Sequence, residues 1–327
     1  MKGDQPELQS VFVEARHIPP PKSVSPQAQA FLSAAAAPMP RPPYPALEDK
    51  AGWKAYIAAA DRAFPLAANA DDPEIKSETT TLGGVPTYVA MPPTADDKRV
   101  YLDIHGGALI MGGGELCGTM GRFMARRVGV RTLSVDYRMP PDHPYPAALD
   151  DCLRAYRALL KRHAPGQIVV GGVSAGGNLA AALMLRARDE GLPLPAGLVL
   201  LTPELDLTES GDSFQTNRDI DVVLRHGLPE ANALYAGGHG LAHPYLSPLF
   251  GDFTKGFPRT FLQAGTRDVF LSNAVRMHRA LRRARVDVEL HIFEGMPHGG
   301  FFGAPEDQEL AAEIRRFVDE CWPRAAC

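Results

Sequence analysis

The 327-residue chain has few cysteines and no long apolar run. Its four cysteines are scattered without a Cys-x-x-Cys pair, so the sequence encodes neither a disulfide framework nor a zinc knuckle, and a reducing compartment suits them. The longest apolar runs fall far short of the ~20 residues that a membrane span needs. Charges near the amino terminus replace the apolar stretch of a signal peptide. We therefore expect a cytoplasmic protein with no membrane span.

The chain also lacks an excess of positive charge and several motifs of cofactor-dependent enzymes. It has 34 basic and 38 acidic side chains, a net charge of −4, which disfavours a nucleic-acid surface. It contains no Gly-x-Gly-x-x-Gly, no His-Glu-x-x-His and no Gly-Lys-[Ser/Thr] sequence. These absences disfavour a nicotinamide oxidoreductase, a metal hydrolase and a nucleotide-binding protein. We expect no metal and no cofactor.

The amino-terminal part is rich in proline, with ten of the 30 prolines in the first 45 residues. Their fixed φ angles disfavour a long helix. The apolar spacing over residues 47–64 then predicts a helix that ends before Pro65 and the polar residues beyond it. We interpret residues 1–72 as an amino-terminal helical cap.

Beyond the cap, short apolar runs alternate with helical patterns. Residues 76–91 predict a hairpin around Gly83-Gly84, and Ser272 is expected to cap a late helix. Alternation of this kind predicts an α/β fold with a mostly parallel sheet and helices on both faces. Residues 205–245, polar and glycine-rich, interrupt it and are interpreted as a second cap insertion, which divides the catalytic core into 73–204 and 246–327. The expected core strands are 100–105, 132–136, 168–172, 198–201, 260–264 and 286–293.

A Gly-x-Ser-x-Gly sequence centred on Ser174 follows one expected strand and opens a helix. In this strand–turn–helix context the pattern is a nucleophile elbow, whose glycines at 172 and 176 allow a strained turn and close packing. A merely structural serine is the alternative. The sequence thus predicts that the Ser174 hydroxyl projects above the sheet as a nucleophile.

A serine nucleophile needs a base and a group that orients the base. His298 lies in a glycine-bounded loop after the final strand, at the edge of the sheet where Ser174 is expected. Asp268 follows the preceding strand and fits the order serine, acid, histidine. The alternative for Asp268 is a turn acid at the start of the next helix. Ser174, Asp268 and His298 form the predicted catalytic triad.

The segment His105-Gly-Gly-Ala108 follows the first long strand. Backbone amides of small residues can bind a tetrahedral oxyanion without steric obstruction. We predict that Gly106, Gly107 and Ala175 supply these donors; a flexible glycine turn is the alternative.

These motifs together resemble the hormone-sensitive-lipase-like family of α/β-hydrolase carboxylesterases, over residues 80–320. The resemblance rests on HGGA, GVSAGGN, GTRD, PHGGF and a block at 136–151 similar to DYRLAPEHPFPAALDD. It implies the α/β-hydrolase fold, the triad and oxyanion hole named above, caps at 1–72 and 205–245, and a structural role for the block. The chain departs from the family at Ala108, usually a third glycine, and at Val173, commonly an acid.

The expected function is hydrolysis of carboxylic esters by a serine esterase through an acyl-enzyme intermediate, without a cofactor. The resemblance implies short- to medium-chain esters, with lactones as an alternative substrate and a noncatalytic small-molecule receptor as an alternative function. The expected partners are a small ester substrate and no nucleic acid, with a homodimer as a possible assembly. Candidate pocket residues are Phe31, Trp53, Tyr56 and Val173, although packing of the cap on the core explains any one of them equally well.

Overall fold

The computed structural model describes residues 10–37, 42–64, 73–93, 95–96 and 98–322. Its centre is an eight-stranded sheet in the order β1-β2-β4-β3-β5-β6-β7-β8, antiparallel from β1 to β4 and parallel from β4 onward. The fold is therefore α/β with a mostly parallel sheet, as the alternation predicts. The strands are β1 (Lys76–Leu82), β2 (Val85–Met91), β3 (Val100–Ile104), β4 (Arg131–Val135), β5 (Ile168–Val173), β6 (Gly197–Leu201), β7 (Thr260–Gly265) and β8 (Val288–Phe293).

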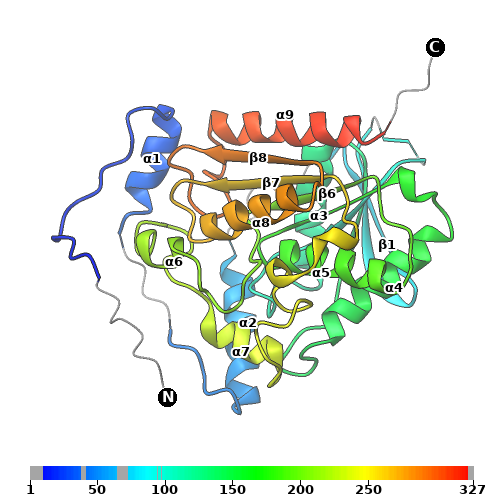
Figure 1. Cartoon of the computed structure of the whole chain (residues 1–327), viewed down its shortest axis with the longest axis horizontal. Helices are drawn as coiled ribbons and strands as arrows, with labels where there is room; N and C mark the ends of the chain where they lie inside the picture. The colour runs from blue at the N-terminus through cyan, green and yellow to red at the C-terminus, as the bar shows by residue number, and fades with distance from the viewer. Residues whose placement is uncertain (1–9, 38–41, 65–72, 94, 97, 323–327) are drawn as a thin grey trace.

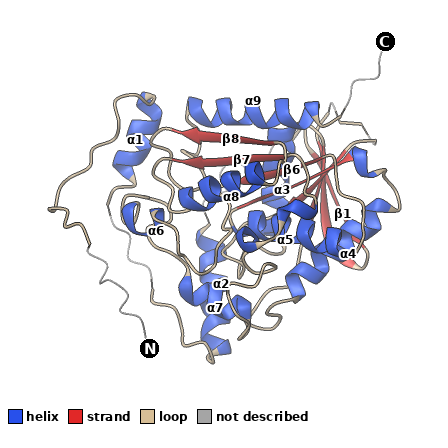
Figure 2. Cartoon of the chain, in the orientation of Figure 1, coloured by secondary structure: helices blue, strands red, loops and turns tan. Residues whose placement is uncertain are grey.

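Helices cover both faces of the sheet (Figure 2). On one side are α4 (Ala147–Leu160), α5 (Ala175–Asp189) and α8 (Leu271–Arg283), and on the other α1 (Pro26–Ala34), α3 (Glu115–Val128) and α9 (Pro305–Glu320). Successive strand residues serve opposite layers, because side chains alternate along a strand. Leu102 and Val170 pack in the first layer, whereas Tyr101 and Val169 pack in the second. The central strands are buried on both faces, as expected of a parallel sheet.

A third apolar cluster lies outside these two layers. It joins α2 (Lys50–Ala63), α6 (Ser213–Thr216) and α7 (Pro229–Ala236) to residues that follow β7, with Trp53, Phe214, Leu228, Val269 and Phe270 among its members. In Figure 1 the arrowheads of β7 and β8 point toward α1 and α6, and α2 and α7 lie on the side away from α9. The remaining short helices are η2 (Pro165–Gln167), η3 (Pro248–Phe250) and η4 (Phe253–Lys255).

Two helices lie in the described part of the amino-terminal segment. The helix expected over 47–64 is α2, where the Asp49 side chain accepts a hydrogen bond from Gly52 N at 2.8 Å and so begins the helix. The proline-rich stretch also holds the nine-residue α1, which the proline runs do not predict. Pro26 stands in its first turn, where no amide hydrogen is needed, and Ser25 Oγ accepts from Ala28 N at 3.1 Å.

The prediction that Ser272 caps a helix is wrong. Helix α8 begins at Leu271 with Phe270 at its N-cap, so Ser272 lies inside the first turn. Its hydroxyl instead accepts from Ser213 N, while its own amide donates to Ser213 Oγ, both at 2.9 Å. This reciprocal pair of hydrogen bonds connects α8 with α6. The Ser272 hydroxyl therefore bonds to a distant segment and not to the end of its own helix.

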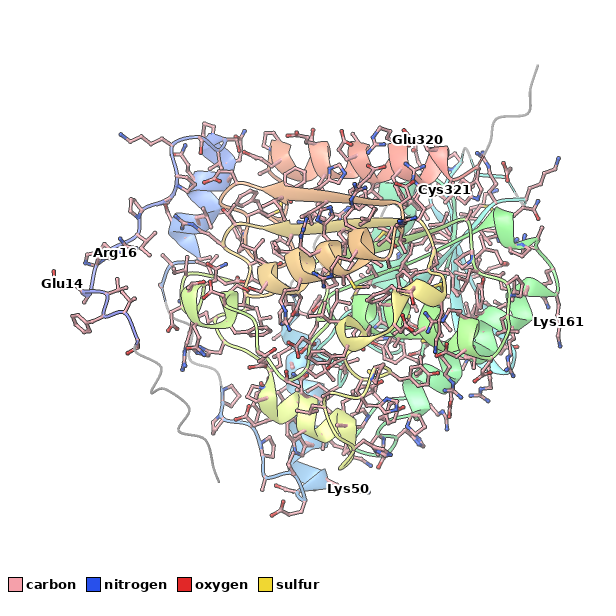
Figure 3. All side chains as sticks on the ribbon, viewed as in Figure 1. Glu14, Arg16, Lys50, Lys161, Glu320 and Cys321 are labelled. Atoms are coloured by element: carbon pink, nitrogen blue, oxygen red, sulfur yellow. The ribbon has the colours of Figure 1, made fainter. Side chains whose placement is uncertain are left out.

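Within the described residues, none of the helices has the length and apolar character needed to cross a bilayer. Cys117, Cys152 and Cys321 are free thiols, and Cys327 lies outside the described residues. Figure 3 shows the long side chains of Lys50 and Lys161 extending from the periphery of the molecule, and both residues are exposed.

Candidate active site

Ser174 lies at the turn between β5 and α5, in a backbone conformation that non-glycine residues rarely adopt. Its φ is 57° and its ψ −120°. A Cβ atom on Gly172 would meet Gly176 O at 2.2 Å, and one on Gly176 would meet Ile104 O at 1.9 Å. Both positions must therefore be glycine for strand and helix to approach this closely. The turn presents the hydroxyl at the carboxyl edge of the sheet.

His298 lies between Ser174 and Asp268 and contacts both. Its Nε2 is 3.0 Å from Ser174 Oγ, and its Nδ1 is 3.1 Å from Asp268 Oδ1. Asp268 is fully buried, and the same oxygen accepts from Phe270 N at 2.9 Å. The carboxylate thus also holds the turn at the start of α8, the alternative that the sequence left open. The Phe270 ring packs nearly perpendicular to the imidazole, with 4.9 Å between the ring centroids.

Two carboxyl groups dominate the electrostatic environment of His298. Burial lowers its pKa, but Asp268 and then Asp221 raise it, and the net effect is a pKa above the usual 6.5. Glu204 is fully buried, and burial raises its pKa to about 8. A raised pKa means that the imidazolium form is stabilised. This suits a general base, which must take up a proton during the reaction.

The loop after β3 places Gly106 beside the serine, and Gly107 follows it in the chain. A Cβ atom on Gly106 would lie 3.5 Å from the Cβ atom of Ser174. Gly107 has a φ of 125°, and its carbonyl accepts from the amides of Ile110 and Met111, each at 3.0 Å. Ala175 is the first residue of α5, where backbone amides have no partner within the helix. The structure thus brings the three expected oxyanion donors to the same region as Ser174.

The loop is also strained at Ala108, the position where the family usually has a third glycine. Ala108 has a φ of 52°, in the left-handed region that favours glycine. The neighbouring helix α2 contacts this loop, because Asp61 Oδ1 accepts a hydrogen bond from Gly112 N at 2.9 Å. The conformation of the loop therefore depends on contacts from outside it.

The four candidate pocket side chains lie in two separate places. Phe31 packs against Phe301 and Phe302, with ring centroids 6.3 and 5.6 Å away, in the apolar layer that also receives Val173. Trp53 is fully buried and packs with Tyr56 and Tyr44 in the third cluster. Trp53 Nε1 donates to Ala46 O at 3.0 Å.

Several residues that contact the candidate triad carry no motif by which sequence reasoning could find them. Asp221 and Asn217 lie in the segment that the sequence analysis interprets as a second insertion, and both contact the loop of Asp268. Glu204 lies just past β6, and its backbone amide donates to Ser174 O at 3.2 Å. The sequence signal at Glu204 is an acid shortly after an expected strand. The surroundings of Asn217 and Asp221 show no periodicity that would single them out.

One group of described residues has the donor atoms for a metal ion. Atoms of His105, Cys117 and Asp136 lie within 4.8 Å of one another, whereas donors around a tetrahedral zinc ion are about 3.5 Å apart. His105 Nδ1 is 2.7 Å from Gly106 O, and Tyr137 stacks on the ring at 4.1 Å. The Nδ1 atom of His105 therefore already lies against a backbone carbonyl.

Comparisons with known proteins identify the family to which this fold belongs. Residues 101–302 match the family model described as alpha/beta hydrolase fold. An esterase of Acinetobacter venetianus is 34% identical over 235 residues, which are 68% of this chain and 76% of that protein. The crystal structure of the esterase E25 has a TM-score of 0.86 and 35% identity, and covers 95% of this chain and 98% of its own. The structure of an esterase from the bacterial hormone-sensitive lipase family has a TM-score of 0.78 and 32% identity, and covers 91% and 99%. This chain therefore belongs to the α/β-hydrolase-fold family, in the group of the bacterial hormone-sensitive-lipase esterases.

Proposed function

We propose that the chain is a serine carboxylesterase in which Ser174, His298 and Asp268 act as nucleophile, base and orienting acid. The observation that supports this most strongly is the continuous hydrogen-bonded line from Ser174 Oγ through the imidazole to Asp268. A neutral imidazole that donates from Nδ1 to Asp268 leaves the Nε2 lone pair free to accept the serine proton. A noncatalytic receptor would have no need of this arrangement.

The reaction proceeds in two halves. As His298 takes the proton, Ser174 Oγ attacks the ester carbonyl, and the amides of Gly106, Gly107 and Ala175 bind the oxyanion. His298 then gives its proton to the departing alcohol, which leaves an acyl group on Ser174. Water, deprotonated by His298, attacks this acyl-enzyme and releases the acid. Every proton transfer uses the same imidazole, so no cofactor is needed.

The substrate proposal is an ester of a short- to medium-chain acid. Residues 1–72 and 205–245 act as the cap over the site, and their described parts meet in the third apolar cluster beside Phe270. An apolar surface near the nucleophile favours an uncharged acyl chain. A chain-length series of nitrophenyl esters beside a lactone panel ranks the substrates, and higher turnover of lactones than of every linear ester would replace this proposal with the lactonase alternative.

The test of mechanism is Ser174→Ala. It should abolish hydrolysis of a nitrophenyl ester and labelling by a fluorophosphonate probe, because both need the same oxygen. Ser210, whose hydroxyl bonds to Asp206 at 2.6 Å, offers a matched control in Ser210→Ala, which should keep both. Wild-type turnover by Ser174→Ala would refute the mechanism. The homodimer and the cytoplasmic location remain predictions, and size-exclusion chromatography tests the first.

A further inference from the structure

A buried aspartate outside the triad holds the backbone of two triad loops. Asp221 lies between α6 and α7 in the second insertion and is fully buried. Its Oδ1 accepts from the amides of Val223 and Leu224, both at 3.0 Å, which closes a local turn. Its Oδ2 accepts from Val269 N at 3.1 Å, and His298 N lies 3.2 Å from Oδ2 and 3.3 Å from Oδ1. One carboxylate thus receives hydrogen bonds from four backbone amides.

Two of these four amides belong to the predicted catalytic machinery. Val269 directly follows Asp268, and His298 is the base itself. The same insertion also holds the other end of the peptide unit that links Asp268 to Val269, because Asn217 Nδ2 donates to Asp268 O at 2.8 Å. Asp221 N in turn donates to Asn217 O at 3.0 Å. This peptide unit is therefore fixed at its carbonyl and at its amide by residues four apart in the chain.

The environment of Asp221 is unfavourable for its charged form. Burial raises the pKa of Asp221, and the neighbouring Asp268 carboxylate raises it further. A buried anion beside another anion is stable only when donors fill its lone pairs, which the four amides do. The groups that face His298 are Ser174 on one side, Phe270 on its ring, and the carboxyl groups of Asp268, Asp221 and Glu204.

We propose, on the basis of the esterase function proposed above, that Asp221 is a positioning residue that sets the separation and orientation of Asp268 and His298. It acts through the Val269 and His298 amides, and its negative charge adds to that of Asp268 in stabilising the imidazolium. The second insertion is thereby part of the catalytic scaffold as well as a cover, because it carries the carboxylate to which both loops are bonded.

The test is Asp221→Asn, measured on the full chain with a nitrophenyl ester across pH. An amide of the same shape has one oxygen where the carboxylate has two, so its NH₂ group must face at least one backbone amide hydrogen. We expect kcat to fall about 10- to 100-fold, the result of a small displacement of the reacting groups, with KM changed less than twofold. We also expect the acid limb of kcat/KM to move about 1 unit lower in pH, because a negative charge near His298 is lost.

The matched control is Asp219→Asn, an exposed aspartate two residues away. Its φ of 62° is a conformation that asparagine tolerates. Because the side chain is exposed, neither kcat nor the acid limb should change. An Asp221→Asn enzyme with the wild-type acid limb and kcat would overturn the proposal, as would a loss of kcat with an unmoved acid limb, which indicates a structural role alone.

A second variant tests the geometric part of the proposal if Asp221→Asn does not fold. Asn217→Ala removes the bonds to Asp268 O and Thr266 O and keeps the Asp221 charge, so kcat should fall about 10-fold or more, while the acid limb should stay unmoved because that charge remains. Unchanged kcat would overturn the proposal. Ser174→Ala separates this question from the esterase function: a failure of that variant to lose activity refutes the triad, whereas a normal Asp221→Asn enzyme refutes only the positioning role.

Discussion

Glu204 makes the stability of the protein depend on pH in a direction opposite to that of most carboxylates. It is fully buried, and neither carboxyl oxygen has a hydrogen-bond partner among the described residues. Burial raises its pKa from 4.5 to about 8, and the nearby Asn232 side chain offsets only part of this. Between these two values the folded protein keeps the proton that the unfolded chain has lost. Stability therefore falls as pH rises from 4.5 toward 8, then levels off.

The size of this effect follows from the two pKa values. Each difference of 1 in pKa corresponds to about 1.4 kcal/mol, so the upper limit is about 5 kcal/mol. Glu204→Gln replaces the acid by a neutral group of the same shape and removes the dependence. Relative to the wild type, its free energy of unfolding should therefore rise by about 2 to 4 kcal/mol between pH 5 and pH 9.

Urea denaturation of both proteins at pH 5, 7 and 9 measures the difference. Glu309→Gln, at an exposed position on α9, is the matched control and should follow the wild type at each pH. If the free energies of unfolding of Glu204→Gln and the wild type differ by the same amount at all three pH values, Glu204 is ionised in the folded protein. That result would refute the reasoning from its burial.

Three further predictions concern the triad and the elbow. Asp268→Asn should lower kcat by roughly 10⁴ because the imidazole loses its tautomer; a tenfold loss in steady-state assays would give the role to another acid. Since the pKa of His298 is raised and only its neutral form accepts the serine proton, the acid limb of kcat/KM should have its midpoint above pH 6.5, and a lower midpoint contradicts this. Gly176→Ala should destabilise the protein by about 1 to 3 kcal/mol or more in thermal unfolding, because the new methyl group meets Ile104 O. Gly166→Ala, which meets nothing within 4 Å, should be tolerated, and equal effects of the two changes would contradict the close approach.

The sequence predicts those parts of the molecule that local backbone requirements determine. The core strands and the hairpin fall within a few residues of their expected places, because alternation and apolar runs report burial directly. Ser174 is recognisable because its strained turn demands glycines at fixed positions. The loops of Asp268 and His298 are recognisable because parallel strands end at one edge of the sheet.

What the sequence does not predict depends on contacts between distant segments. Asp221 meets His298 across 77 residues, and no local pattern distinguishes it from the exposed Asp219. Helix α1 contacts α9, where Ser25 Oγ donates to Glu306 at 2.8 Å, and its proline-rich surroundings do not predict it. Ser272 has the residue type of a cap, yet its partner is Ser213. In each case tertiary contacts outweigh local propensity.

The hydrogen bond from Gly112 to Asp61 connects the amino-terminal helix α2 with the loop that carries Gly106 and Gly107. Any outward swing of α2 that separates these two residues also releases one restraint on the amides meant for the oxyanion. The position of α2 and the geometry of these donor amides are thus coupled, so a substitution that weakens the packing of α2 should also lower turnover.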